Sequence, residues 1–277
     1  MSVLIGNESI DLELTLVESA QCFHWTKADN RYGAVLNGRP VWIWQEDGRV
    51  MADDGADIAF LRAYLDLDRD YAAIAEEYAR FEKASQVVRM YPGLRVLNQP
   101  TWETLVAFII SANNNVGRIR TIVGKLVTGY GQRFDTPHGT LYAFPGPEIL
   151  AGCTAEELHA LGMGYRDKYI LETARAVAEG FPLEALRRLD YDAAHKQLTS
   201  LMGVGDKVAD CVQLFGCGHA EAFPVDVWVA RMVKVVFQLE GMNRRQIGSE
   251  ARRMLGKNAG ILQQFLFHAS RTGALEV

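Results

Sequence analysis

The glycine pair Gly203 and Gly205, set between two helical patterns, constrains the fold more than any other stretch of this sequence. Glycine has no Cβ, so two glycines one residue apart favour a tight backbone turn. On both sides of the turn, apolar residues recur with the spacing of one helix face. These residues are Val208, Cys211, Val212 and Phe215 after the turn, and Ala194, Leu198 and Leu201 before it. The stretch therefore predicts two helices joined by a Gly-Val-Gly hairpin.

Two charged residues near this hairpin can carry chemistry. Lys207 is expected in the first turn of the second helix, where a cation opposes the helix dipole. Partial desolvation there would favour the neutral amine, which is the nucleophilic form. Asp226 follows Pro224 and precedes an apolar helical stretch from 227 to about 239, at the place of a helix N-cap. For each residue taken alone, the alternative is a solvated lysine and an ordinary capping aspartate.

The combination resembles the helix-hairpin-helix DNA glycosylases, and in particular their 8-oxoguanine DNA glycosylase branch. The resemblance rests on GVGDKVADC at residues 203–211, followed by PVDV at residues 224–227. It implies that Lys207 is the nucleophile and that Asp226 is the carboxylate that supports it. The free N–H groups after Gly203 and Gly205 suit a DNA phosphate.

Composition limits the class of protein. The chain has 277 residues, of which 49% are hydrophobic and 23% charged, as is typical of a water-soluble protein with an ample core in one large or two ordinary domains. No apolar run reaches the length of a membrane span, and residues 1–10 lack the pattern of a signal peptide. The four cysteines are scattered, without metal-site spacing or the tight cluster of an iron–sulfur centre. We expect no metal, no cofactor, no membrane contact and a cytoplasmic protein.

The net charge of −5 argues at first against a DNA partner. The distribution of charged residues along the chain removes part of this objection. Residues 1–85 carry 8 basic and 16 acidic side chains, whereas residues 86–277 carry 21 and 18, which gives net charges of −8 and +3. Phosphate affinity also comes from local placement of charge and from backbone N–H groups, so the positive part can bind nucleic acid in a salt-dependent way.

The first third of the chain predicts a small antiparallel α+β domain over residues 1–90. Alternation over residues 10–14 indicates a strand, and apolar runs at 33–36 and 40–44 flank Asn37-Gly38, a strong hairpin signal. Residues 56–90 are helical, with an acidic break at 64–68. An all-α helix-hairpin-helix domain over residues 91–277 would complete an α+β fold.

Aromatic residues gather in Ser19-Ala20-Gln21-Cys22-Phe23-His24-Trp25. From local pattern alone this is a strand with Phe23 and Trp25 in the core. It also resembles a segment of 8-oxoguanine glycosylases in which a glycine carbonyl accepts the N7 hydrogen that only the oxidised base has. The matching residue is Ala20, which keeps the carbonyl but restricts φ.

A buried helical stripe from Trp102 to Ile110 ends in three consecutive asparagines and Arg118. Asparagines are poor helix formers with many donors and acceptors, so they either cap a helix junction or form a polar plug that reads base edges. The resemblance favours the plug. It implies that Asn113 enters the gap left by the extruded base, with Asn114 supporting it, and that Arg118 contacts the unpaired cytosine.

A loop is expected over residues 130–150 and a short helix over 155–161, after which a second glycine turn, at 162–164, opens another helix. Tyr165 and Arg166 on this turn are either plain surface residues or DNA contacts. The resemblance implies that the Tyr165 ring wedges into the duplex and that Arg166 reads the orphaned cytosine.

The last helix is expected over residues 259–270, with Gln263 and Phe267 on one side. Without the resemblance, they are an exposed glutamine and a core phenylalanine. With it, Gln263 bonds the Watson–Crick edge of the flipped base, and the base lies between Phe267 and Cys211. The branch often has histidine two residues after the essential aspartate, where this chain has Trp228.

The resemblance therefore implies a bifunctional DNA glycosylase/lyase for double-stranded DNA containing an oxidised guanine opposite cytosine, and we expect it to act as a monomer. Two alternatives remain: a related glycosylase for another damaged base, and a hairpin module that only binds DNA.

Overall fold

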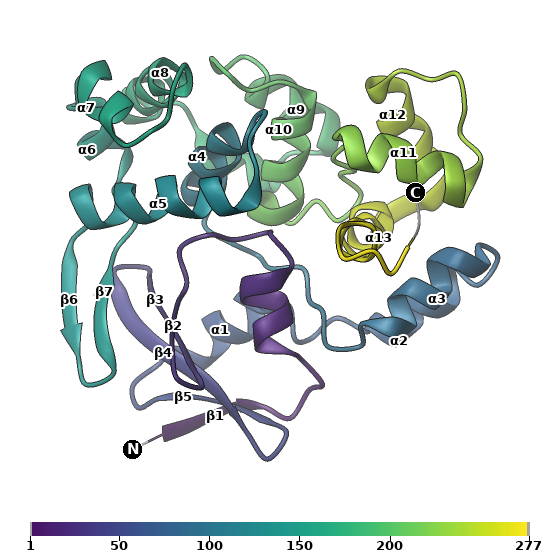
Figure 1. The fold of residues 1–277 in the computed structure, drawn as a ribbon, viewed down its shortest axis with the longest axis horizontal. Coiled ribbons are helices and arrows are strands. Elements are labelled where there is room, and N and C mark those ends of the chain that lie inside the picture. The colour runs from purple at the N-terminus through teal and green to yellow at the C-terminus, as the bar shows by residue number, and fades with distance from the viewer. Residues whose placement is uncertain (1, 276–277) are drawn as a thin grey trace.

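The computed structural model describes residues 2–275 and has a small antiparallel sheet packed against a larger helical body (Figure 1). The strand order of the sheet is β1-β5-β4-β3-β2, and neighbouring strands are antiparallel. The strands are β1 (Ser2–Gly6), β2 (Thr26–Ala28), β3 (Arg31–Leu36), β4 (Arg39–Glu46) and β5 (Arg49–Asp53). A sheet followed by a helical body confirms the predicted α+β architecture.

The turn between β3 and β4 is the predicted two-residue hairpin. Asn37 and Gly38 have φ values of +48° and +72°, and Leu36 pairs with Arg39 across the turn. Two positive φ values give the turn a twist that matches the twist of the strands.

The strand predicted over residues 10–14 is wrong, because this stretch enters a helical segment. The segment continues as the π-helix η1 (Leu14–Glu18), and Asp11 Oδ1 accepts a hydrogen bond from Leu14 N at 2.9 Å. Leu12 is buried in the core of the sheet, whereas Leu14 is buried in the core of the helical body. The alternation of apolar residues thus reflects burial against two cores rather than one strand face.

The loop predicted over residues 130–150 contains a β-hairpin, which is a second correction. β6 (Arg133–Thr136) pairs antiparallel with β7 (Gly139–Tyr142). Trp42 Nε1 donates to Thr136 Oγ1 at 2.8 Å, and Trp42 shares a small core with Leu141. The strands form against the sheet, a tertiary contact that local propensity does not reveal.

The helical body is organised around α4, whose side chains are buried on nearly every face. No helix within residues 2–275 is long and apolar enough to cross a membrane. The helices are α1 (Ile58–Tyr64), α2 (Tyr71–Glu77), α3 (Glu82–Met90), α4 (Thr101–Ser111), α5 (Val116–Tyr130), α6 (Pro147–Ala151), α7 (Ala155–Ala160), α8 (Arg166–Ala178), α9 (Tyr191–Leu198), α10 (Asp206–Val212), α11 (Val227–Phe237), α12 (Arg244–Leu255) and α13 (Ala259–Arg271), with the short segments η2 (Leu183–Arg188), η3 (Gln213–Cys217) and η4 (Gly256–Asn258).

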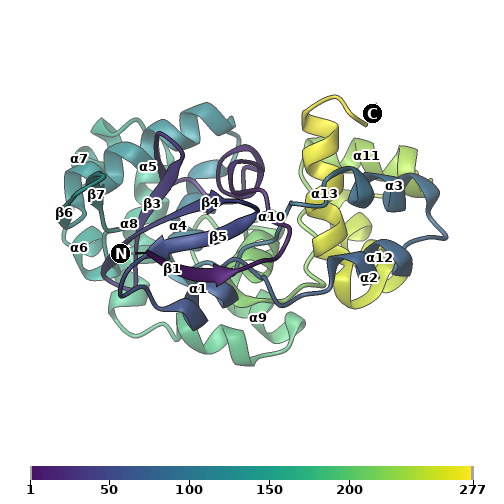
Figure 2. The ribbon, with the colours of Figure 1, turned by 90° about the horizontal axis from the view of Figure 1, so that it is seen from below.

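The helix α3 packs against the C-terminal helix α13, and α2 packs against α3, away from the sheet that precedes them in the chain (Figure 2). Their buried side chains, from Tyr71 to Val88, belong to the same core as α4 and α13. The helical core therefore draws on residues before the boundary predicted near residue 90, which stays a prediction.

Candidate active site

The predicted hairpin joins α9 to α10, and its two glycines have different tasks. Gly203 has a φ of +82°, and a Cβ added there would lie 2.6 Å from the Tyr169 Cβ atom. Gly205 has an extended conformation, with φ −92° and ψ 179°, and open space around it. No side chain within residues 2–275 caps the first turn of α10. Gly203 is thus required by the turn itself, while Gly205 leaves the N–H groups of α10 uncovered.

A cavity of about 770 Å³ lies beside the hairpin and brings most of the predicted site residues together. Its wall comes from α10, α13, the end of α4, the start of α11 and the segment around Ala20, which are far apart in the sequence. The predicted residues that line it are Lys207, Asp226, Ala20, Cys211, Gln263, Phe267, Asn113, Asn114, Gly203 and Gly205.

Lys207 lies in the first turn of α10, as predicted, and its amine is held at the cavity wall. Its Nζ donates to Ser111 Oγ at 3.0 Å and lies 5.0 Å from the centre of the Phe108 ring. The side chain is half-buried. An amine so placed can reach a group bound in the cavity.

Asp226 is the N-cap of α11, which confirms the predicted capping role. Its Oδ1 accepts a hydrogen bond from Val229 N at 2.8 Å. This bond fixes the carboxylate at the start of the helix while the side chain still lines the cavity with Lys207. A negative charge is thereby held where positive charge on a bound substrate can be stabilised.

Gln263, Phe267 and Cys211 face the cavity from α13 and α10. The Gln263 amide donates through Nε2 to Pro224 O at 3.1 Å, whereas its Oε1 is buried and receives no hydrogen bond from residues 2–275. A buried acceptor without a donor is costly unless a ligand supplies one. Burial raises the pKa of the Cys211 thiol to about 12, so Cys211 offers a neutral sulfur surface.

The segment around Ala20 is irregular rather than the strand that its local pattern suggested, and β2 begins only at Thr26. Ala20 has a φ of +59°, a left-handed conformation that favours glycine. Gln264 Nε2 holds the preceding carbonyl, of Ser19, at 2.8 Å. Phe23, which sequence reasoning assigned to the core, also lines the cavity. Ala20 therefore adopts the left-handed conformation that glycine would adopt at this position, although its Cβ restricts φ.

The residues predicted to read the opposite strand form a second group at the rim of the cavity. Asn113 Nδ2 donates to the Tyr165 hydroxyl at 3.2 Å, and Tyr165 is 50% exposed. Arg118 Nη2 donates to Gly162 O at 3.2 Å. This group lies where the Asn113 loop meets the start of α8.

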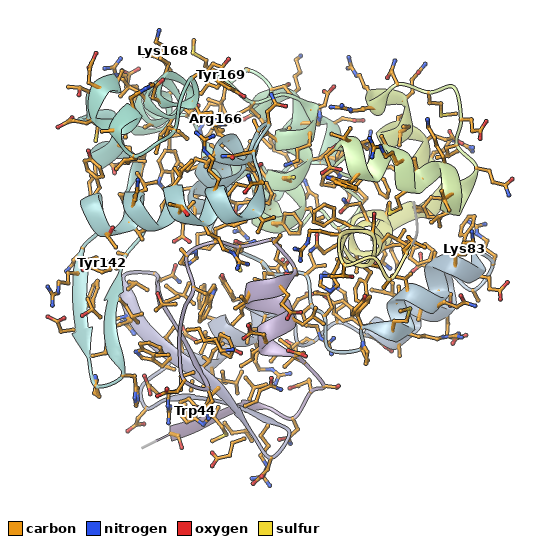
Figure 3. All side chains as sticks on the ribbon, in the orientation of Figure 1. Trp44, Lys83, Tyr142, Arg166, Lys168 and Tyr169 are labelled. Carbon is orange, nitrogen blue, oxygen red and sulfur yellow. The ribbon has the colours of Figure 1, made fainter. Side chains whose placement is uncertain are left out.

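Arg166, labelled in Figure 3 at the start of α8, is buried, whereas Asn113, Arg118 and Tyr165 are exposed. Its Nη1 donates to Met163 O at 3.0 Å, its Nε to Ala112 O at 2.8 Å and its Nη2 to Asn113 O at 3.0 Å. The guanidinium thus supports the asparagine loop in this conformation. Its predicted contact with cytosine stays a prediction.

A buried carboxylate lies one turn after Lys207 on α10. Burial raises the pKa of the Asp210 carboxyl to about 7, and the Tyr191 hydroxyl donates to its Oδ1 at 2.5 Å. The Arg252 guanidinium lies 4.0 Å from the centre of the Tyr191 ring. This contact links α9, α10 and α12 at the cavity wall.

The helix α12 and its cavity-lining arginines were missed by sequence reasoning. Arg244, Arg245 and Arg252 line the cavity from this helix. Asn243 and Gln246 form a capping box, and that N-x-x-Q spacing is the signal that could have predicted the helix start. Ser111 and Phe108 gave no such signal, because only the fold places them beside Lys207.

Trp228 is half-exposed at the mouth of the cavity, in the place where the resemblance leads one to expect histidine. The residue is 52% exposed, and the Arg231 guanidinium lies 5.5 Å from the centre of its ring. Large exposed aromatic side chains beside a cavity are typical of binding surfaces.

Within residues 2–275, no group of three or more His, Cys, Asp or Glu side chains could hold a metal ion. The polar groups that line the cavity include the Lys207 amine, the Asp226 carboxylate, the Gln263 amide and the arginines of α12.

Comparisons with known proteins identify the two parts of the chain. Residues 2–105 match the N-terminal domain of 8-oxoguanine DNA glycosylase, and residues 106–257 match the HhH-GPD superfamily of base excision DNA repair proteins. A probable N-glycosylase/DNA lyase from Methanothermobacter thermautotrophicus is 35% identical over 66% of this chain and 66% of its own length. The N-glycosylase/DNA lyase OGG1 of Arabidopsis thaliana is 34% identical over 78% of this chain and 64% of its own length. The matches thus span just under two thirds of these relatives.

A solved structure extends the similarity over nearly the whole chain. The 8-oxoguanine glycosylase/lyase of Clostridium acetobutylicum, in complex with double-stranded DNA containing cytosine opposite 8-oxoguanine, superposes with a TM-score of 0.89 at 29% identity, over 97% of this chain and 94% of that one. The present chain therefore belongs to the HhH-GPD superfamily of base excision DNA repair proteins, with the N-terminal domain of the 8-oxoguanine DNA glycosylases.

Proposed function

We propose that the protein is a bifunctional DNA glycosylase/lyase that excises 8-oxoguanine paired with cytosine and then cleaves the DNA strand. The observation that carries the proposal is one cavity lined by an amine, Lys207, a carboxylate, Asp226, and an unpaired amide oxygen, Gln263 Oε1. Similarity to glycosylase/lyases, one of them bound to DNA with this lesion pair, supports the substrate.

The base has to leave the helix for an enzyme to reach C1′ of its sugar. In the cavity, Gln263 Oε1 accepts a hydrogen bond from the Watson–Crick edge of the base, and Phe267 and Cys211 cover its two faces. The Ala20 carbonyl accepts the N7 hydrogen that distinguishes 8-oxoguanine from guanine. These contacts offset the free energy lost when the base is unstacked.

The chemical steps use Lys207 and Asp226. The neutral amine forms a bond to C1′ while the glycosidic bond breaks and its electron pair leaves with the base, which takes up a proton. Asp226 stabilises the positive charge that develops on the sugar. Loss of a proton from nitrogen and opening of the sugar ring give a Schiff base. Removal of a C2′ proton then expels the 3′ phosphate, and water releases Lys207.

The second group of residues, at the Asn113 loop and the start of α8, contacts the DNA strand opposite the lesion and the gap in the duplex. We assign Asn113, supported by Asn114, to the gap left by the extruded base, and Tyr165 to a wedge in the duplex. Arg118 and Arg166 contact the unpaired cytosine, which requires Arg166 to leave some of its carbonyl partners. The N–H groups after Gly203 and Gly205 bind a phosphate. We further propose that the protein acts as a monomer in the cytoplasm.

The test is borohydride trapping on a duplex with one 8-oxoguanine opposite cytosine, beside an undamaged duplex. We expect a covalent adduct with the damaged duplex only, and none with Lys207→Gln. Lys83→Gln is the matched control, because Lys83 is exposed on α3, far from α10 (Figure 3). Its adduct yield should equal that of the wild type.

Each other outcome leads to a different conclusion. Base release without an adduct would mean that Asp226 and water do the chemistry and that the role of Lys207 is wrong. Adducts only with other damaged bases would favour a related glycosylase of different specificity. Binding without release of any base would leave a hairpin module that only binds DNA.

A further inference from the structure

The single hydrogen of the Ser111 hydroxyl is donated to a backbone carbonyl and is not available to Lys207. Ser111 is the last residue of α4, and its Oγ donates to Phe108 O at 2.7 Å. A serine hydroxyl has one hydrogen and two acceptor lone pairs. Towards Lys207, whose Nζ lies 3.0 Å away, Ser111 Oγ can therefore act only as an acceptor.

This restriction decides what happens to the lysine nitrogen. A serine free to rotate could donate its hydrogen to a neutral amine and occupy the lone pair that has to attack C1′. Ser111 takes one N–H of the amine instead. Because the nitrogen is tetrahedral, its lone pair does not point at Ser111 and stays free for a group bound in the cavity that Lys207 lines.

The frame around Ser111 is rigid. Phe108, whose carbonyl holds the hydroxyl, stacks on Phe215 with ring centres 5.3 Å apart and packs edge-on against Phe23 at 6.1 Å. Phe108 and Phe215 are buried. A group fixed by such packing keeps its geometry while DNA binds.

We propose that Ser111 is a positioning residue that orients the Lys207 amine for attack. The inference rests on the proposed function, since it takes Lys207 to be the nucleophile. It assigns to Ser111 no contact with DNA, so its effect falls on the rate of bond formation and not on affinity.

The experiment compares Ser111→Ala with Ser111→Thr on a duplex that holds a preformed abasic site, which removes base recognition from the measurement. Single-turnover borohydride trapping gives the rate of Schiff-base formation, and binding to a duplex with a tetrahydrofuran abasic analogue gives the affinity. We expect Ser111→Ala to slow trapping by about tenfold or more, since small losses of alignment are costly to bond formation. The dissociation constant should change by less than about twofold. Threonine keeps a hydroxyl that can bond a carbonyl of the preceding turn, so Ser111→Thr should restore most of the rate.

Ser200→Ala is the matched control. Ser200 follows α9 and donates to Gln197 O at 2.7 Å, the same local bond that Ser111 makes, but it receives no hydrogen bond from a lysine within the described chain. Its variant should trap at the wild-type rate. If Ser111→Ala fails to fold, the nearly isosteric Ser111→Cys replaces it, since a thiol is a weak acceptor and should also slow trapping.

The outcomes separate this inference from the proposal on which it rests. Trapping by Ser111→Ala or Ser111→Cys at the wild-type rate would overturn the positioning role. A parallel loss of rate and affinity would also overturn it, because that pattern indicates a general structural role. Trapping that persists in Lys207→Gln would instead overturn the proposed nucleophile.

Discussion

At the scale of single residues, two residues of the site have a left-handed backbone conformation, which alanine disfavours and asparagine tolerates better. Ala20 and Asn113 have φ values of +59° and +49°, and both line the cavity. Left-handed backbone costs a non-glycine residue about 1–2 kcal/mol. Such strain is typical of functional sites, where the surrounding packing maintains it.

Replacing Ala20 with glycine should raise the free energy of unfolding by up to about 1 kcal/mol, because relief of the left-handed strain exceeds the extra chain entropy of glycine. Base excision should persist, since the carbonyl stays in place. Urea denaturation measures the change. Ala73→Gly, on the exposed face of α2, is the control and should lower stability by about 0.5–1 kcal/mol. A destabilised Ala20→Gly would show that the positive φ carries no strain.

The two hairpin glycines should respond differently to alanine. Gly203→Ala adds a Cβ at φ +82°, 2.6 Å from the Tyr169 Cβ, and should destabilise the protein by about 2–4 kcal/mol. Gly205→Ala has room and an ordinary φ, so stability should change little, while affinity for a tetrahydrofuran-containing duplex falls as the methyl group covers the α10 amides. Thermal unfolding and binding titrations test both. Equal loss of stability in the two variants would contradict this assignment.

At the scale of elements, the hydrogen bond between Tyr191 and Asp210 joins α9 to α10 beneath the cavity. Burial raises the pKa of the Asp210 carboxyl to about 7, above its value of about 4 in the unfolded chain, and the Tyr191 hydroxyl opposes that rise. A raised folded pKa means that the folded state holds a proton that the unfolded chain releases. Stability therefore falls as the pH rises from about 4 through 7.

Tyr191→Phe removes the opposing hydroxyl and should deepen this fall. We expect a loss of about 1 kcal/mol at pH 5 and about 2–3 kcal/mol at pH 8, where the carboxylate is buried without its donor. Urea denaturation across this range measures it. In an Asp210→Asn background the pH dependence of the Tyr191→Phe effect should vanish. Its persistence there would place the titrating group elsewhere.

The elements with strong local signals were predictable. The hairpin at Asn37-Gly38, the stripe of α4, the capping Asp226 and the helices around Gly203 all follow from spacing and turn chemistry. The conformations of residues 10–14 and of the hairpin β6–β7 could not be predicted in this way, because each depends on packing against a distant part of the chain. Likewise, the role that we propose for Lys207 follows from a motif, whereas its hydrogen-bond partner Ser111, 96 residues earlier, is brought to it only by the fold.

At the scale of the whole molecule, buried polar contacts tie the segment around Ala20 to the helical body. Gln21 Nε2 donates to Arg95 O, and Gln99 Nε2 donates to Gln21 O, both at 2.8 Å. Next to them, His24 Nε2 lies 3.3 Å from Glu103 Oε2 of α4. These contacts between residues 21–24 and residues 95–103 therefore fix the part of the cavity wall that contains Ala20. We call this set of contacts the joint between the sheet and the helices.

The His24 and Glu103 pair should make this joint sensitive to pH. Burial raises the pKa of Glu103 to about 8 and lowers that of His24 to about 4. Below about pH 6.5 the two shifts change stability in opposite directions, because a lowered histidine pKa adds stability as the pH rises. Between about pH 6.5 and 8 Glu103 is the member of this pair that still titrates, and its contribution to stability should fall as the pH rises.

Glu103→Gln cannot ionise and should remove that fall, leaving the variant more stable than the wild type above pH 8 by about 2 kcal/mol, a cost of the order expected for a buried unpaired group. Urea denaturation at several pH values provides the measurement, with Glu156→Gln, at an exposed position on α7, as the control. If the stability of Glu103→Gln falls with pH as steeply as that of the wild type, Glu103 is not the group whose titration causes the fall.

The exposure of Trp228 gives the molecule an optical signal of its own. Among the five tryptophans, all of which lie within residues 2–275, only Trp228 is exposed, and it stands at the mouth of the cavity. Its indole should emit at longer wavelength than the four shielded rings and should be the one that iodide in solution quenches. Under the proposed function, DNA bound at the cavity should shield this ring, and its emission would then report occupancy of the site without any label.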